Sequence, residues 1–137
     1  MTAVWYRDIQ PLQEPFDVGT LDDAGRVVCT FNVLVTKRGS ADTVGEIVGV
    51  LQTAGVGLLH REIFAPGIPV PCGDGPYLVL RPTGGSSPLG THNDGVGAYR
   101  RPSLQVTALA KSWAAAESLA QAAYTALIAV RNREVTA

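Results

Sequence analysis

Residues with the potential for chemistry are few in this chain, and most of them lie between positions 72 and 101. Gly84, Gly85, Ser86 and Ser87 could present successive backbone N–H groups to an anion, as a phosphate-binding nest does. No Gly-Lys-Ser/Thr sequence follows them, and they do not lead directly into a predicted helix, as a P-loop requires. The sequence therefore favours a flexible turn over a phosphate site.

His92 and Asp94 are close enough in the chain to share a metal ion or a proton. The only other histidine is His60, in a predicted strand, and no Cys or His spacing typical of a zinc site occurs. Asp22 and Asp23 could act as paired carboxylates, but Asp close to Gly is typical of a turn between strands. The sequence thus predicts solvated loops here, with no catalytic residue, no cofactor and no metal site.

Three further candidates concern nucleophilic chemistry and binding. Cys72 lies beside prolines with no activating base near it in the sequence, which favours an inert thiol over a nucleophile. Arg100 and Arg101 could clamp carboxylates or a DNA phosphate, although an adjacent pair at the start of a strand is more often solvated. Gly45 and Gly49 leave a small-residue groove on a predicted helix, which could admit a neighbouring backbone or be a tolerated weakness.

Composition limits what the protein can bind. Charged residues make up 17% of the 137 residues and the formal net charge is -1, so no global basic field would hold nucleic acid by its phosphates. The two cysteines lack a disulfide-like spacing, which favours reduced thiols in a cytosolic setting over a single disulfide. No apolar run reaches the roughly 20 residues of a membrane-spanning helix, and Arg7 and Asp8 come too early for a signal peptide. We expect one soluble domain, residues 1–137.

Periodicity and capping residues predict the elements that position these candidates. A strand is expected over residues 27–36, with one apolar face made of Val27, Cys29, Phe31, Val33 and Val35. A short amphipathic helix is expected over residues 42–55, begun by Asp42 and closed by Gly55. A longer helix is expected from a Ser112 cap to Arg131, and the residues predicted to share one of its faces are Trp113, Ala116, Ala120, Ala123 and Leu127.

Three further strands are expected at residues 56–64, 76–82 and 103–110. Strands outnumber helices and lie both before and after them, so the predicted fold class is α+β. We expect a mostly antiparallel sheet of about five strands with two helices packed on one face. Residues 81–102 are rich in Gly, Ser, Pro and Asn and are predicted to form a long loop. Contacts with partners are expected there.

Between Thr43 and Val130 the chain carries, in order, a helix ending LQTAGVG, the pair Ile63-Phe64, the strands YLVLRPTGG and SLQVTALAKS, and the helix WAAAESLAQAAYTAL. This stretch resembles the tail terminator proteins of long-tailed bacteriophages, also called minor capsid or tail completion proteins. No single motif is diagnostic, and the resemblance depends on order and spacing.

In that family, a segment similar to residues 5–38, with an aromatic strand, a QEP turn, a DD-x-GR hairpin and an FNV strand, follows the long helix. Here it comes first. The resemblance therefore implies a circular permutant: residues 1–38 match the family's C-terminal segment, residues 39–40 (Gly-Ser) are the joint, and residues 41–137 match its N-terminal part. Such rearrangement is tolerated where chain ends lie close together at the surface. The alternative is a natural N-terminal hairpin that merely looks like the family's tail, and a permuted order could itself be natural or engineered.

The resemblance implies a structural role without catalytic residues. Family members form a ring, generally of about six subunits, that sits on the last tube-protein ring, stops tail growth and offers a surface to the head connector. The partners implied are other copies of the chain, the tail tube protein and the head-tail connector protein, with DNA only in passage and no membrane. The implied location is the virion tail, and the host cytoplasm during assembly.

The residues expected at the subunit or partner interface are Gly45, Gly49, Ser86, Ser87, His92, Asp94, Tyr99, Arg100 and Arg101. The rival hypothesis is a small-ligand binding module or enzyme that uses the Gly-rich loop, residues 83–100.

Overall fold

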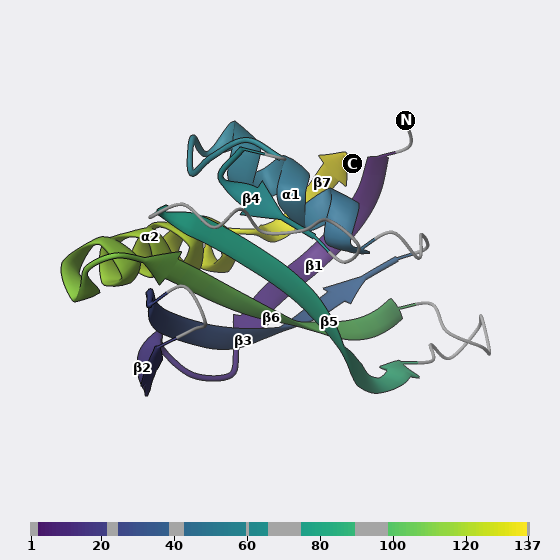
Figure 1. Ribbon diagram of the computed structural model, residues 1–137. Coiled ribbons are helices and arrows are strands. Elements are labelled where there is room, and N and C mark those ends of the chain that lie inside the picture. The colour runs from purple at the N-terminus through teal and green to yellow at the C-terminus, as the bar shows by residue number, and fades with distance from the viewer. Residues whose placement is uncertain are drawn as a thin grey trace.

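The strand predicted around Phe31 is β3 (Val27–Lys37), which lies inside the sheet between β6 and β1 (Figure 1). Its apolar face is confirmed, because Cys29, Phe31, Val33 and Val35 are all fully buried. The structure is a computed structural model, and it describes residues 3–21, 25–38, 43–59, 61–65, 75–89 and 99–136.

The described residues build one seven-stranded sheet in the order β4-β5-β6-β3-β1-β7, with β2 also paired to β3. Every pair is antiparallel except β4 with β5. The other strands are β1 (Ala3–Pro11), β2 (Phe16–Leu21), β4 (Ile63–Phe64), β5 (Tyr77–Leu89), β6 (Tyr99–Ala110) and β7 (Arg131–Thr136). The α+β class and the mostly antiparallel sheet are confirmed, but the predicted number of strands, about five, was too low.

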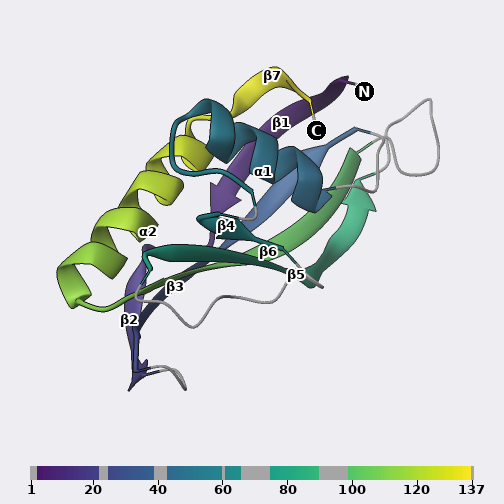
Figure 2. The ribbon, with the colours of Figure 1, turned by 45° about the horizontal axis from the view of Figure 1, so that its top comes forward.

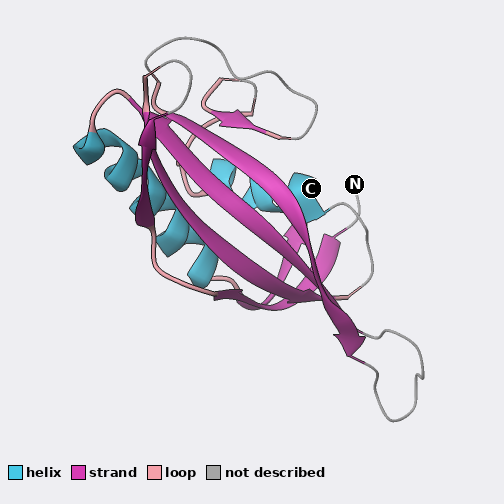
Figure 3. Ribbon diagram, turned by 60° about the horizontal axis from the view of Figure 1, so that its bottom comes forward, coloured by secondary structure: helices cyan, strands magenta, loops and turns pink. Residues whose placement is uncertain are grey.

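Two helices, α1 (Thr43–Thr53) and α2 (Trp113–Ile128), lie on the same side of the curled sheet (Figures 1 and 3). α2 packs on β1, β3 and β6, whereas α1 contacts α2, β5 and β7. The Oγ of Ser112 accepts the Ala115 N–H at 3.3 Å, so Ser112 is the predicted cap. The buried face of α2 is Ala116, Ala120, Ala123 and Leu127. Trp113, predicted on that face, is 42% exposed, since it stands at the very end of the buried stripe.

The end of α1 also follows its sequence. Gly55 has φ 78, a left-handed conformation that favours glycine. The Val56 N–H bonds to the Leu51 carbonyl at 3.0 Å, and the Gly55 N–H to the Gln52 carbonyl at 3.1 Å. These two bonds make a Schellman motif that satisfies the last carbonyls of the helix. The predicted cap at its start, Asp42, lies outside the described residues.

The predicted strand over residues 56–64 was wrong in extent, since only Ile63 and Phe64 form a strand. The Leu58 carbonyl accepts the N–H groups of Arg61, Glu62 and Ile63 at 3.0 to 3.2 Å, which closes the preceding residues into a turn. Apolar composition alone could not distinguish a long strand from a turn followed by a short strand.

The predicted loop over residues 81–102 was wrong at both ends. β5 continues to Leu89 and β6 starts at Tyr99, so the two strands extend as a ribbon beyond the body of the sheet (Figure 3). Gly85 lies opposite Pro102, and a Cβ added to it would stand 2.3 Å from the Arg101 carbonyl oxygen. Glycine therefore permits a close strand approach here, where its abundance had suggested a loop. We call residues 82–89 and 99–102 the β5–β6 ribbon.

The last strand was not predicted. The expected helix ends at Ile128 rather than Arg131, and β7 follows as an edge strand paired with β1. Arg131, Asn132, Arg133 and Glu134 are all exposed, so this strand shows no apolar alternation.

β1 and β2 share one edge of β3. Pro11 pairs with Val33 and Phe16 with Thr30, so β1 lies along the second half of β3 and β2 along the first half. The Leu12 N–H still bonds to the Asn32 carbonyl at 2.9 Å. We call the residues that interrupt this edge, 12–16, the β1–β2 bulge.

None of the helices in the described part of the chain is both long enough and apolar enough to span a bilayer.

Candidate subunit interface

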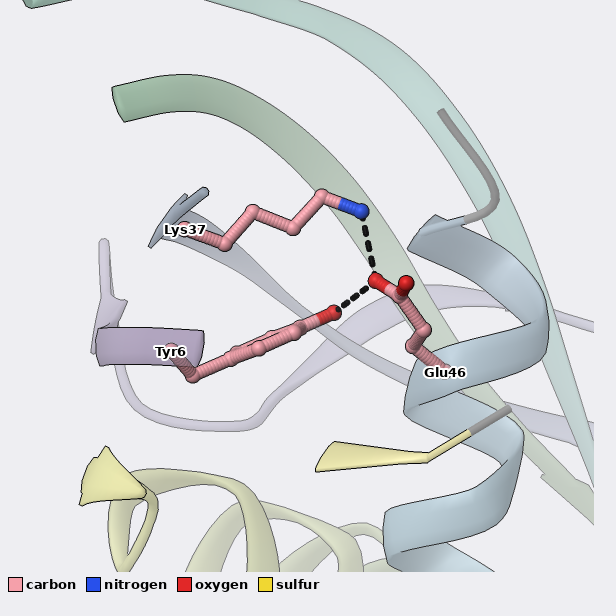
Figure 4. Close-up of polar contacts among 3 residues, drawn as sticks. All are labelled: Tyr6, Lys37 and Glu46. Atoms are coloured by element: carbon pink, nitrogen blue, oxygen red, sulfur yellow. Dashed lines mark hydrogen bonds and ion pairs between the residues drawn. The ribbon is translucent and has the colours of Figure 1, made fainter. Parts of the chain in front are cut away.

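A buried polar cluster anchors α1 to the sheet (Figure 4). Tyr6 of β1, Lys37 at the end of β3 and Glu46 in the first turn of α1 point toward one another. The Lys37 Nζ lies 2.5 Å from the Glu46 Oε1, and the Tyr6 hydroxyl donates to the same oxygen at 2.8 Å. The Lys37 and Glu46 side chains are 0% and 1% exposed. Because a buried charge needs such partners, this cluster fixes where α1 lies and hence where Gly45 and Gly49 are presented.

The cluster was not predicted from the sequence. A lysine at the end of a strand and a glutamate in the first turn of a helix are usually solvated, so neither residue suggested a buried contact. The one available signal is that Lys37 follows Val35 by two positions and Val33 by four, so it falls on the same buried face of β3.

A hollow lies between α1 and β7 at Gly49, one of the two glycines at which a small-residue groove was considered. It measures about 270 Å³ and is lined by Gly49, Val50, Thr53, Arg133, Glu134 and Val135, and we call it the α1–β7 hollow. Gly45 lies one turn earlier on the helix and is half-buried. The missing side chain of Gly49 leaves part of this space open.

A second hollow joins the β5–β6 ribbon to α1. It measures about 180 Å³, and among the residues that line it are Thr43, Val44, Pro82, Gly84 and Arg100. Arg100 is exposed and lies opposite Lys37 in the sheet, whereas Arg101 is half-buried opposite Ser86. The structure thus brings one predicted interface residue, Arg100, to the first turn of α1.

The other predicted residues fall on the ribbon or outside the described chain. Ser86 and Ser87 belong to β5 and Tyr99 begins β6. The residues considered as an anion nest, 84–87, lie in β5, and three of them, Gly84, Gly85 and Ser86, pair with residues of β6. His92, Asp94 and Cys72 lie outside the described residues, as do Asp22, Asp23 and His60.

The remaining cysteine is enclosed. Cys29 is fully buried and is a free thiol. Burial, followed by the negative charges of Glu117 and Asp17, raises the pKa of this thiol above its usual 9.0. The described residues contain no group of three or more His, Cys, Asp or Glu side chains able to hold a metal ion.

Large apolar side chains stand in solvent at several places that sequence reasoning missed. Leu12 is 55% and Phe16 is 45% exposed, and both belong to the β1–β2 bulge, on either side of the exposed Glu14. The remaining exposed apolar side chains are Trp5, Leu58, Leu59 and Trp113. A third hollow, about 530 Å³, lies between the end of α1 and α2, and its lining includes Gly55, Val56, Gln121 and Ala122; we call it the α1–α2 hollow.

Comparisons of the chain with protein-family models, with curated proteins and with solved structures each found no match.

Proposed function

We propose that this protein is a structural virion protein of the tail terminator kind, which assembles into a ring, caps the tail tube and joins it to the head connector. The observation that carries the proposal is the pairing of β7 with β1 (Figure 2). Ala3 lies opposite Thr136 and Val4 opposite Val135, in antiparallel register. Adjacent antiparallel strands are what a short hairpin joins, so the elements from α1 to β7 continue in space into β1, in the order of the family.

The opposite joint has a compatible geometry. In the order of the family, β3 would end the chain and α1 would begin it. The buried ion pair between Lys37 and Glu46 holds these two elements together by side chains. A chain break at residues 39–40 is therefore plausible on physical grounds, and supports the division into residues 1–38, the joint and residues 41–137.

The proposed role is mechanical and needs no catalytic residue or cofactor. A cyclic ring requires two different, mutually complementary patches on each subunit. The α1–β7 hollow, the β5–β6 ribbon and the exposed apolar residues of the bulge offer such surfaces. The proposed partners in the virion tail are further copies of the chain, about six to a ring by the resemblance to the family, together with the tail tube and head-tail connector proteins.

The rival, a ligand-binding module or enzyme, depended on residues 83–100. The hollow at the base of this segment is about 180 Å³, which is below the roughly 300–1,000 Å³ of small-molecule sites. This small volume counts against the rival at the described ends of the segment, residues 83–89 and 99–100.

Size-exclusion chromatography with light scattering, followed by negative-stain imaging, tests the proposal. We expect discrete rings with an axial opening to form as the protein concentration rises. A chain that stays monomeric at every concentration and salt level, alone and with tail tubes, would overturn it. Replacing His92 and Asp94 by Ala should leave the rings intact, whereas a ligand-induced rise in Tm that these changes abolish would favour the rival.

A further inference from the structure

We propose that copies of this protein associate head to tail, with the β1–β2 bulge of one copy seated in the α1–β7 hollow of the next. This inference rests on the proposed function, because it names the two patches that would build the ring.

The bulge has the chemistry of a docking segment. Leu12 and Phe16 are among the most exposed large apolar side chains in the described chain, at 55% and 45%, and they flank a carboxylate, Glu14. The bulge separates the pairing of β1 with β3, which ends at Pro11, from the pairing of β2 with β3, which begins at Phe16, so Glu14 has no partner residue in the β3 register. Apolar side chains around one charge can bury area and set orientation in the same contact.

The hollow has the complementary chemistry. Val50 and Val135 supply apolar walls, and Gly49 leaves room between them. A cavity of about 150 Å³ accepts a benzene-sized group, and this hollow measures about 270 Å³. It can therefore admit one large apolar side chain such as that of Leu12 or Phe16.

Arg133 is the one basic residue in the lining of the hollow. On β7, Arg131 lies opposite Asp8, whereas Arg133 lies opposite Tyr6, which carries no charge. Arg133 is exposed and lines the hollow, although Glu134 does so too. An approaching carboxylate such as that of Glu14 thus meets an arginine with no acidic residue across the strand pair.

The two patches cannot meet within one copy. Arg133 is paired with Tyr6, and β1 runs on from Tyr6 to Pro11, about 16 Å at roughly 3.3 Å per residue, before the bulge begins. β7 and β2 accordingly lie on opposite sides of the molecule in Figures 1 and 2. Since every copy carries both patches at separate places, their pairing is heterologous and yields a ring where the rotation closes.

The α1–α2 hollow is the competing seat for the bulge. It is larger, at about 530 Å³, but its lining residues are Ala54, Gly55, Val56, Ser118, Gln121, Ala122, Thr125 and Ala126, none of them charged. It therefore offers no positive charge to Glu14, and the α1–β7 hollow is favoured.

A charge exchange tests the contact. Glu14→Arg alone and Arg133→Glu alone should each weaken self-association at least about tenfold, and the double variant should recover most of the loss. Sedimentation velocity over a concentration series measures this. Both residues are exposed, so the variants should fold, which thermal unfolding checks. Glu14→Gln and Arg133→Gln provide neutral versions if a reversal proves unstable.

A disulfide trap tests the same contact without relying on its strength. In a Cys72→Ser background, Glu14→Cys combined with Arg133→Cys should give a covalent ladder beyond the dimer under mild oxidation, whereas either cysteine alone stops at the dimer. Glu14→Cys with Gln121→Cys is the matched control for the α1–α2 hollow. A ladder from the control pair but not from the first pair overturns the proposal.

The outcomes separate this inference from the proposed function. Rings that ignore both charge reversals and give no ladder overturn the inference and leave the ring function standing. Open chains that obey the charge exchange support the contact and overturn the closed ring. Wild-type protein that shows no self-association in any form overturns both.

Discussion

Lys37 and Glu46 stand 9 positions apart in the chain and form an ion pair that is almost completely withdrawn from solvent. They belong to the end of β3 and the start of α1, so the pair ties together the two elements on either side of the proposed joint. A buried pair of this kind is not by itself a large source of stability, because both charges lose their hydration. Removing one of the two charged residues, however, is strongly destabilising.

Glu46→Ala should lower the free energy of unfolding by about 3–5 kcal/mol, because it leaves the Lys37 ammonium buried without a carboxylate. Urea denaturation measures the change. The control is the double variant Lys37→Met with Glu46→Leu, which removes both charges and should cost less than Glu46→Ala alone. Equal or greater loss in the double variant would contradict this account of the pair.

Tyr6→Phe removes only the hydroxyl that donates to Glu46. We expect a smaller loss of about 1.5–3 kcal/mol, the usual value for a hydrogen bond to a charged group. The same urea experiment applies. An unchanged midpoint would mean that the Glu46 carboxylate finds an equally good donor elsewhere.

The order of segments found in the family can be restored by circular permutation. A variant that joins position 137 to position 1 through a short linker and opens the chain at residues 39–40 should keep its fold and lie within about 2 kcal/mol of the original, because one short connection replaces another. Circular dichroism and urea denaturation measure this. The control opens the chain between Lys111 and Ser112, where it would cut the cap of α2; it should be clearly less stable. Equal stability of the two variants would contradict the view that residues 39–40 tolerate a chain break better than other connections do.

The sequence was sufficient for the parts of the fold in which one face is buried. The alternation in β3, the capped helices α1 and α2 and the strand before α2 follow directly from the periodicity of apolar residues. The sequence was insufficient for strands that are formed by backbone pairing without an apolar face. In β7, residues 131–134 are polar and exposed and one residue, Val135, is apolar and buried, while the outer part of β5 consists mainly of Thr, Gly, Ser and Pro, so neither carries an alternating apolar signal.

The candidate interface divides in the same way. The Gly49 groove could be anticipated, because small residues one turn apart on a helix leave space. The buried contact of Lys37 with Glu46 and the exposure of Leu12 and Phe16 depend on which elements meet, and no local pattern encodes that.

Gly84 and Gly85 allow the effect of a close strand approach in the β5–β6 ribbon to be distinguished from the effect of a positive φ. At Gly85 a Cβ would meet the Arg101 carbonyl oxygen, whereas at Gly84 nothing lies within 4 Å. Both have positive φ, 132 and 98. Gly85→Ala should therefore perturb the ribbon more than Gly84→Ala, by about 1 kcal/mol or more. Hydrogen exchange of the β5 and β6 amides measures the difference, and equal protection in the two variants would count against the close approach.

The buried thiol makes stability depend on pH in the alkaline range. Because the pKa of Cys29 is raised in the folded protein, the unfolded chain loses this proton first as the pH rises. Above pH of about 9 the unfolded state then binds fewer protons, so the free energy of unfolding falls until the folded thiol also ionises. Urea denaturation between neutral and alkaline pH measures the slope.

Cys29→Ala is the control for this slope. It removes the titrating group and keeps Cys72, so the decline at alkaline pH should be shallower than in the original protein, whatever its overall stability. Parallel curves for the two proteins would show that other groups cause the decline.

The position of β6 next to both β5 and β3 has a mechanical consequence. β6 is bonded to β3 over a long register that runs from Ala110 opposite Val27 to Ser103 opposite Leu34, and its other end continues into the ribbon. A force that draws the ribbon along the strand direction loads the β3–β6 bonds in shear, all at once, whereas a force that peels β5 away from β6 breaks the β5–β6 bonds one after another. Pulling direction, rather than total bond number, would then decide how readily the domain yields under load.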